Sequence, residues 1–194
     1  MGKVIYLTGA PATGKSSLTE RVSARDPSID VFCYSKRLRD YINATSEDSN
    51  LTEESVRRKS ALAITKDDVD AVDQILVEHV AKYRDQKHII IDSHPVTKEN
   101  FGFRITGFSI SRLLELTPDV IVCLYADPEV IRARIENAPA GRPMPTPYEI
   151  ALHNNLQMGV ASQYAVALGK PVYVLDSGID KDRLTEIFME QCKV

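Results

Sequence analysis

The sequence predicts a three-layer α/β/α fold, in which a five-stranded parallel sheet carries helices on both faces. Short apolar runs, typical of strands buried on both faces, alternate along the chain with helical patterns of apolar residues. The chain has 194 residues, 43% hydrophobic and 26% charged, which suffices for one domain with a sizeable core. Strands that alternate with helices in this way are joined by right-handed crossovers.

The strands are predicted at five apolar runs, which lie at 3–8, 30–34, 88–92, 120–125 and 171–176. A helix of about ten residues should follow the first of them. Ser35 would cap a helix over 36–42, and a short basic helix is expected after Thr52. Residues 93–108 are expected to form a loop, too long for a simple connection and therefore a candidate binding segment.

Four more helices are predicted in the rest of the chain. The range 66–83 places Val72, Leu76 and Val80 at the spacing of one helical face, and 110–116 suits a short helix. Asp127 and Pro128 should start a helix that continues to about residue 135. The longest pattern, 148–168, repeats apolar residues every four positions until Gly169 and Pro171 end it, and 181–191 closes the chain as an amphipathic helix.

The stretch from Gly9 to Ser16 has the spacing of a P-loop: Gly, four residues, then Gly-Lys-Ser. Such a loop points successive backbone N–H groups at a phosphate, and the helix after it directs its positive end there. Lys15 would reach the β- and γ-phosphates of ATP, and the Ser16 hydroxyl would bind Mg²⁺. The expected nucleotide contacts are Gly9, Ala10, Pro11, Ala12, Thr13, Gly14, Lys15, Ser16 and Ser17.

Ligands of parallel sheets bind beyond the carboxyl ends of the strands, and Asp92 ends the run 88–92 at that edge. We expect its carboxylate to act with Ser16 on the nucleotide's Mg²⁺. The alternative is that Asp92 only caps the next turn. His94, two residues later, would contact a substrate phosphate or hydrogen-bond the loop, and the sequence does not decide between these roles.

Phosphoryl transfer needs cations around the transferred group, and Arg132, Arg134 and Arg142 are candidates for this role. Residues two positions apart on a helix point in different directions, so only one of Arg132 and Arg134 should face the site. We favour Arg134 and Arg142, against the alternative of a solvated helix surface. Further cations could bind a second anionic substrate or simply cover a surface: Arg57, Arg58, Lys59, Lys36, Arg37, Arg39, Lys98 and Arg104.

Composition excludes several other classes of protein. A net charge of -3 argues against a broad basic surface for nucleic acid, and no apolar stretch approaches the length of a membrane span, so a cytoplasmic protein is expected. Cys33, Cys123 and Cys192 lack a Cys-x-x-Cys spacing and are expected to be reduced core residues. The four histidines lack metal-ligand spacing, so the expected metal is the Mg²⁺ that a nucleotide carries.

Four stretches together resemble the nucleoside-monophosphate kinases, and specifically the archaeal-type adenylate kinases. They lie at 8–16, 91–107, 116–128 and 140–142 with the long helix that follows, and they span most of the chain. The resemblance implies the sheet order 2-3-1-4-5 in a single domain over 1–194. It also implies an acceptor-binding arm near 35–65, a short lid near 136–147, and ATP-dependent phosphorylation of AMP or a related monophosphate with Mg²⁺.

The same resemblance implies roles for individual residues. Arg134 would lie near the donor adenine and Arg142 near the donor phosphates, while Asp176, Ser177 and Gly178 would form part of the adenine-binding turn. The chain departs from the family at Ala12, where glycine is common, and at Val96-Thr97-Lys98, where the wider group places an arginine after the proline. The acceptor arm matches least well, so the family pattern does not choose between Arg57 and Arg58.

Two other functions remain open at this point. A kinase for a nucleoside, sugar or antibiotic hydroxyl would use Asp92 as a general base to activate the alcohol. An adenylate-kinase-like ATPase would act as a conformational switch or assembly factor, since such proteins also carry an Asp-x-His strand end. The sequence predicts nucleotide substrates in each case, and it leaves open whether the protein forms a homo-oligomer.

Overall fold

The computed structural model describes residues 2–45, 64–138 and 144–194. Its centre is a five-stranded sheet in which every neighbouring pair is parallel and the order is β2-β3-β1-β6-β7. These strands are β1 (Val4–Gly9), β2 (Ile29–Cys33), β3 (His88–Asp92), β6 (Val120–Tyr125) and β7 (Val172–Asp176). Since β4 and β5 form a separate pair, this order is the predicted 2-3-1-4-5 when only the strands of this sheet are counted.

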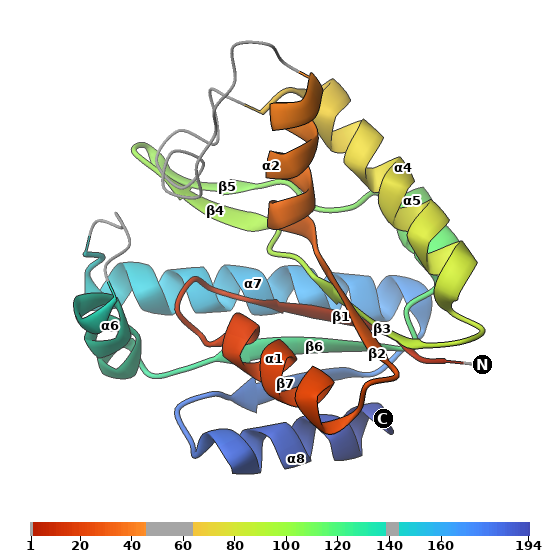
Figure 1. Cartoon of the computed structure of the whole chain (residues 1–194). Helices are drawn as coiled ribbons and strands as arrows, with labels where there is room; N and C mark the ends of the chain where they lie inside the picture. Colours follow the sequence, from red (N-terminus) through yellow and green to blue (C-terminus); the bar gives the residue numbers. More distant parts are fainter. Residues whose placement is uncertain (1, 46–63, 139–143) are drawn as a thin grey trace.

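Helices cover both faces of the sheet, which confirms the three-layer prediction (Figure 1). One face carries α1 (Lys15–Arg25) and α8 (Lys181–Cys192). The other carries α4 (Lys66–Tyr83), α5 (Ile110–Leu116) and α7 (Pro147–Leu168). Two further helices lie outside these layers: α2 (Tyr34–Thr45) packs on α4, and α6 (Pro128–Asn137) packs on α7.

The central strand β1 supplies side chains to both cores in alternation. Val4 and Tyr6 pack under α4, α5 and α7, whereas Ile5 and Leu7 pack under α1 and α8. All four are at most 1% exposed. Full burial of such a side chain contributes roughly 1.5–3 kcal/mol, so a strand between two helical layers is apolar on both faces. This is why its sequence reads as one continuous apolar run.

The main helix boundaries agree with their sequence signals. α4 spans the predicted range and starts with a capping box between Thr65 and Asp68. α6 starts after the N-cap Asp127, with Pro128 in its first turn. α7 ends at Gly169, whose φ of 61° is the left-handed conformation that terminates many helices.

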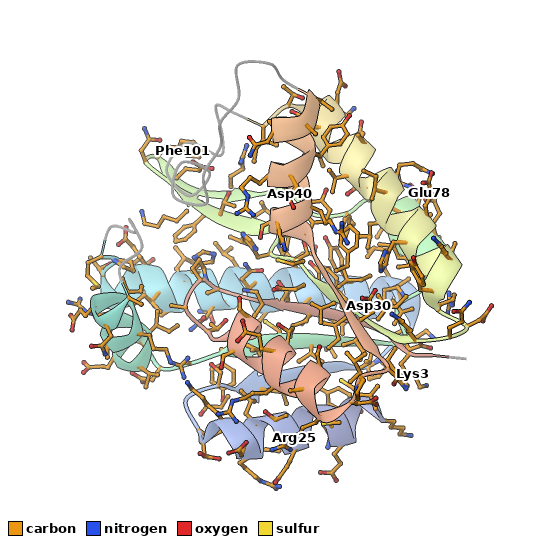
Figure 2. All side chains as sticks on the ribbon, in the orientation of Figure 1. Lys3, Arg25, Asp30, Asp40, Glu78 and Phe101 are labelled. Atoms are coloured by element: carbon orange, nitrogen blue, oxygen red, sulfur yellow. The ribbon has the colours of Figure 1, made fainter. Side chains whose placement is uncertain are left out.

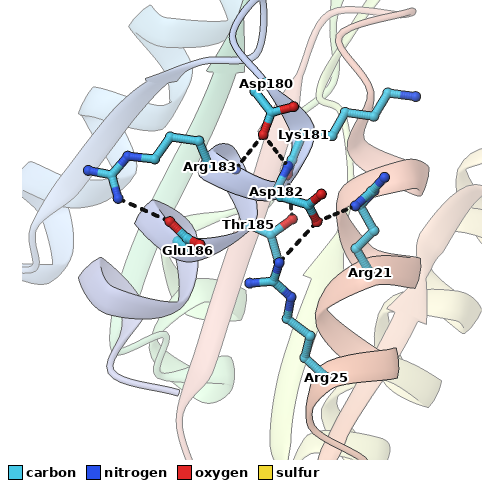
Figure 3. A network of polar contacts seen from close by, with 8 residues as sticks. All are labelled: Arg21, Arg25, Asp180, Lys181, Asp182, Arg183, Thr185 and Glu186. Atoms are coloured by element: carbon cyan, nitrogen blue, oxygen red, sulfur yellow. Dashed lines mark hydrogen bonds and ion pairs between the residues drawn. The ribbon is translucent and has the colours of Figure 1, made fainter.

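An exposed ion-pair network ties α8 to α1 (Figure 3). One oxygen of Asp182 accepts hydrogen bonds from Arg21 at 2.6 Å and from Arg25 at 3.0 Å. Asp180 caps the first turn of α8 through the backbone N–H groups of residues 182 and 183. Solvent screens these pairs, so each contributes at most about 1 kcal/mol, and burial of Leu184 and Phe188 provides the main attachment.

Two local predictions are wrong. The segment 93–108 contains an antiparallel hairpin, β4 (Val96–Glu99) with β5 (Gly102–Ile105), because Val96 and Phe103 find packing partners on other elements. Phe101 lies exposed at its tip (Figure 2). α2 also starts at Tyr34, directly after β2, so Ser35 lies inside the helix instead of capping it, and the helix extends to Thr45.

Other predictions fall wholly or partly outside the described residues. The basic helix near 52–59 lies outside them, as do most of the arm 35–65 and residues 139–143 of the lid 136–147. Cys123 and Cys192 are buried, Cys33 is half-buried, and all three are reduced. Within the described ranges, no helix has the length and apolar character needed to cross a membrane.

Candidate active site

The P-loop lies at the carboxyl end of β1 and leads into α1. Gly9 has a φ of 153°, and a Cβ atom there would stand 2.7 Å from the carbonyl oxygen of Leu124, so no side chain fits. Gly14 occupies the N-cap of α1 with a φ of 89°. The Thr13 hydroxyl donates to the Ala10 carbonyl at 2.7 Å, which closes the curl of the loop. The two glycines singled out in the sequence therefore stand where the backbone requires them.

Ala12 also adopts a left-handed conformation, with a φ of 64°. A residue with a Cβ atom pays about 1–2 kcal/mol for this conformation, which gives a physical reason why glycine suits the position. The carbonyl of Ala12 accepts a hydrogen bond from the Arg134 guanidinium at 3.2 Å. Ala12 thus adopts the left-handed conformation that glycine would adopt at this position, and the hydrogen bond from Arg134 holds its carbonyl.

Lys15 folds back over the loop, and its ammonium donates to the Gly9 carbonyl at 2.8 Å. The side chain is half-buried, and Ser16 beside it is exposed. The charge of Lys15 acts on the neighbouring Asp92, whose pKa it lowers against the larger opposite effect of burial. The lysine is therefore near both the phosphate loop and the carboxylate at the end of β3.

Asp92 pairs in register with Leu7, two residues before Gly9. Its side chain is buried at 8% exposure, and its Oδ1 has no hydrogen-bond partner among the described residues. Burial raises the pKa of this carboxyl, and the Lys15 charge opposes the rise. An unpaired buried carboxylate oxygen is costly unless it meets a cation, a metal-bound water or a proton. The site thus fits the carboxylate partner predicted for the Mg²⁺ of a nucleotide.

Arg134 links α6 to the P-loop and to the turn after β7. Besides Ala12, its guanidinium contacts the hydroxyl of Ser177 at 3.3 Å and the carbonyl of the same residue. Burial lowers the pKa of Arg134, and the carboxylate of Asp176 opposes this shift. Asp176 also accepts the N–H of Gly178 at 2.7 Å, so the predicted adenine turn is an ordered feature. Arg132 faces elsewhere, beside Glu129 and Glu136.

Three of the residues predicted to bind the acceptor are described: Lys98 and Arg104 lie on the hairpin β4–β5, and His94 lies just before it. Lys98 pairs with Glu149 at 3.0 Å, and Arg104 pairs with Glu99 at 3.3 Å, so both cations already have carboxylate partners. His94 is half-buried. Arg57, Arg58, Lys59 and Arg142 lie outside the described residues, and their predicted roles stay predictions.

The basic residues of α2 and two phenylalanines of the segment 93–108 have surface or packing contacts. The Arg37 guanidinium lies 5.5 Å from the centre of the Phe32 ring, and Arg39 pairs with Asp40 at 3.4 Å. Phe108 packs edge-on against Tyr6, and Phe103 packs edge-on against His153. Phe103 and Phe108 therefore serve as packing residues.

Sequence reasoning missed a buried polar group on α7. His153, Asn154 and Gln157 are at most 7% exposed and contact residues at the strand ends. Asn154 donates to the Ala126 carbonyl at 2.9 Å, and Gln157 accepts from the Thr8 hydroxyl at 3.0 Å. In the sequence these residues appear as polar interruptions of an apolar helix. The apolar stripe of the same helix gives no indication that they are buried.

His153 is held neutral by its surroundings. Its Nε2 donates to the Val96 carbonyl at 3.0 Å, since a carbonyl can only accept. Burial lowers its pKa to about 4, the charges of Lys15 and Lys98 add to this, and the Val96 hydrogen bond opposes it. The imidazole therefore serves as a neutral hydrogen-bond donor at physiological pH.

We expect His153 to make stability depend on pH. Between its ordinary pKa of 6.5 and its folded pKa of about 4, the unfolded chain binds a proton that the folded chain does not, so stability falls as the pH falls. The effect reaches about 3 kcal/mol across the window. Urea unfolding of the wild type and His153→Gln at about pH 7 and about pH 4.5 measures it. The wild type should lose more stability than the variant, and equal losses would contradict the prediction.

Three comparisons place this geometry among known proteins. The family model described as AAA domain matches residues 8–151, well over half of the chain. The adenylate kinase of Methanoculleus marisnigri is 26% identical over 188 residues, covering 93% of this chain and 96% of that protein. The adenylate kinase of Methanopyrus kandleri is 27% identical over 193 residues, covering 98% of this chain and 96% of that protein.

Among solved structures, a sugar kinase from Janibacter sp. HTCC2649 superposes with a TM-score of 0.59. The match covers 100% of this chain and 96% of that one at 14% sequence identity, so it bears on the fold alone. It supports the three-layer fold, and the two relatives support a kinase-like P-loop protein. The predicted resemblance to nucleoside-monophosphate kinases is thereby confirmed.

Proposed function

The chain belongs to the AAA domain family, and from that premise we propose that it is a nucleoside-monophosphate kinase that converts ATP and AMP into two molecules of ADP. The observation that carries the proposal is the convergence of Lys15, Asp92 and Arg134 on one P-loop at the carboxyl edge of the sheet. AMP is favoured as the acceptor because both relatives described above, which match almost the whole chain, are adenylate kinases.

The donor ATP would bind with its phosphates in the P-loop. Backbone N–H groups within residues 9–17, where Pro11 has none to give, and the Lys15 ammonium would hold the phosphates, as the curl of the loop supports. Arg134 and the turn of Asp176, Ser177 and Gly178 would border the adenine, since they form one hydrogen-bonded unit with the loop.

Mg²⁺ would be held by Ser16 together with the nucleotide, with Asp92 as the carboxylate partner. The Oδ1 of Asp92, which has no hydrogen-bond partner within the described ranges, supports this assignment. Bound Mg²⁺ neutralises the phosphate charge that develops during transfer. The protein's own work is positioning: Lys15 and Arg142 would place positive charge beside the donor phosphates, and the acceptor phosphate would lie in line with them.

The acceptor site is proposed between the P-loop and the hairpin. His94 follows Asp92 and Ser93 in the sequence and would lie beside this site. Lys98 and Arg104 would have to exchange their carboxylate partners for the phosphate of AMP. One arginine of the pair Arg57 and Arg58 would supply a further charge. An ionised phosphate oxygen is already a nucleophile, so this reaction requires no general base.

An acceptor panel tests the proposal. The purified chain is incubated with MgATP and AMP, CMP, GMP, UMP or dTMP in turn, and ADP formation is followed by a coupled assay. We expect AMP to give the highest rate, far above the rate without acceptor. If no monophosphate raised ADP formation above that background, the proposal would be overturned.

A hydroxyl kinase is the second candidate, and the state of Asp92 favours it specifically. A carboxyl whose pKa is raised by burial, with one oxygen that no described residue hydrogen-bonds, could accept a proton from an alcohol. Nucleosides and sugars added to the panel separate the two functions by which acceptor is phosphorylated. ATP hydrolysis that no acceptor stimulates would instead favour an ATPase switch or assembly factor.

A further inference from the structure

Three polar side chains on α7, spaced four residues apart, face the hairpin and form what we call the polar stripe: Glu149, His153 and Gln157. Glu149 pairs with Lys98 of β4 at 3.0 Å. His153 donates to the Val96 carbonyl at 3.0 Å, and the Gln157 side-chain amide donates to the same oxygen at 3.4 Å. The hairpin is therefore fastened along one face of α7 by side chains on three successive turns.

Gln157 makes a second contact that leaves the hairpin. Its Oε1 accepts from the Thr8 hydroxyl of β1 at 3.0 Å, while its Nε2 reaches Val96 of β4. Both Gln157 and Thr8 are 0% exposed. Water cannot replace either bond at such a place, so loss of one partner leaves a buried polar group unsatisfied. One side-chain amide thus bridges two strands that belong to different sheets.

The two bridged strands lead to the two halves of the candidate site. Thr8 immediately precedes Gly9, the first residue of the P-loop. Val96 follows His94 by two residues and Asp92 by four. Backbone pairing of β1 with β3 already fixes the register of Asp92 itself. The chain leaves the sheet after Ser93, whose N–H donates to the Leu7 carbonyl at 3.1 Å. Beyond that point, the Val96 carbonyl held by His153 and Gln157 is one of its attachments to α7.

We propose that Gln157 is a positioning residue, which with His153 fixes the segment 92–96 relative to the P-loop so that acceptor and donor phosphates can align. The inference rests on the proposed function, because it concerns the alignment that phosphoryl transfer needs. A misplacement of about 1 Å costs up to about 100-fold in rate. Neither side chain needs to touch a nucleotide to have this effect.

Gln157→Met and Thr8→Val test the bridge, since each removes hydrogen-bonding groups at nearly constant volume. We expect kcat to fall about 10- to 100-fold in Gln157→Met, with the ADP dissociation constant changed less than about twofold. The double variant should be no slower than the slower single variant, because both break one bridge. Gln163→Met is the matched control, because Gln163 lies exposed on the same helix. The kcat of this variant should equal that of the wild type.

Hydrogen exchange of the amides at 96–105 provides a readout that is independent of activity. Exchange in this hairpin should be faster in Gln157→Met and Thr8→Val than in the wild type and Gln163→Met. Unchanged hairpin exchange, or unchanged kcat per folded molecule, would overturn the inference. A wild type that phosphorylates no acceptor would overturn the proposed function instead, and exchange would still decide whether the bridge fixes the segment. If Gln157→Met did not fold, Thr8→Val, which replaces one hydroxyl by a methyl group, would decide.

Discussion

Replacing Lys15 by alanine should lower kcat by about 10³-fold or more, because a fixed positive charge beside the transferred phosphoryl group is lost. In the structure its ammonium lies over the P-loop and donates to the Gly9 carbonyl, a place from which it can move onto a phosphate. The fold should survive, since the lysine is half-buried and makes one such bond. That bond contributes only about 1 kcal/mol.

The measurement is steady-state turnover with MgATP and AMP, together with ADP binding by calorimetry and thermal unfolding. Lys170→Ala, at an exposed lysine just after α7, is the matched control and should behave as the wild type. Loss of Lys15 also removes the charge that opposes the raised pKa of Asp92, so this pKa should rise further. Wild-type turnover in Lys15→Ala would refute the P-loop assignment.

Asp92→Asn should separate activity from stability. The carboxylate is buried, its Oδ1 has no partner among the described residues, and its pKa is raised by burial. A raised carboxyl pKa means that the folded state binds more protons than the unfolded state just above the ordinary pKa. Stability therefore falls as the pH rises through that window, and the cost persists at neutral pH. A neutral amide of the same shape avoids the cost.

We therefore expect Asp92→Asn to unfold in urea at an equal or higher concentration than the wild type at neutral pH. Its kcat should fall about 10²- to 10³-fold, and a higher Mg²⁺ concentration should be needed for half-maximal rate. Asp85→Asn, at an exposed aspartate, controls for the change of charge. Unchanged kcat and Mg²⁺ dependence would reduce Asp92 to a structural residue at the end of β3.

Much of the fold could be predicted because its signals are local. The alternation of β1 side chains between two cores makes its sequence continuously apolar, and α4 and α7 carry capping residues at the positions that their patterns required. The hairpin β4–β5 could not be predicted in this way. Its two strands are only four residues each, and their partners on α7 lie some fifty residues further along the chain.

The candidate site also combines features that adjacent residues predict with features that only the packing of distant elements reveals. The spacing from Gly9 to Ser16 predicts the curl of the loop and the start of α1 from adjacent residues, whereas Leu124 of β6 is what leaves no room for a side chain at Gly9. Arg134 was favoured over Arg132, and only the packing of α6 shows that its guanidinium reaches Ala12 and Ser177. Lys98 and Arg104 were candidates for binding an acceptor or for covering a surface, and the structure pairs both with carboxylates that no spacing had linked to them.

By itself the sequence determined the succession of the five sheet strands along the chain, the phosphate loop and the strand that ends in Asp92. Each of these depends on residues within a few positions of one another, where periodicity and backbone preference act directly. The tertiary structure alone decided that Gln157 joins Thr8 to Val96 and that the Oδ1 of Asp92 is buried with no partner in the part of the chain that the structure describes. Thr8 and Gln157 are 149 positions apart. Such contacts depend on how whole elements pack, and no local pattern encodes them.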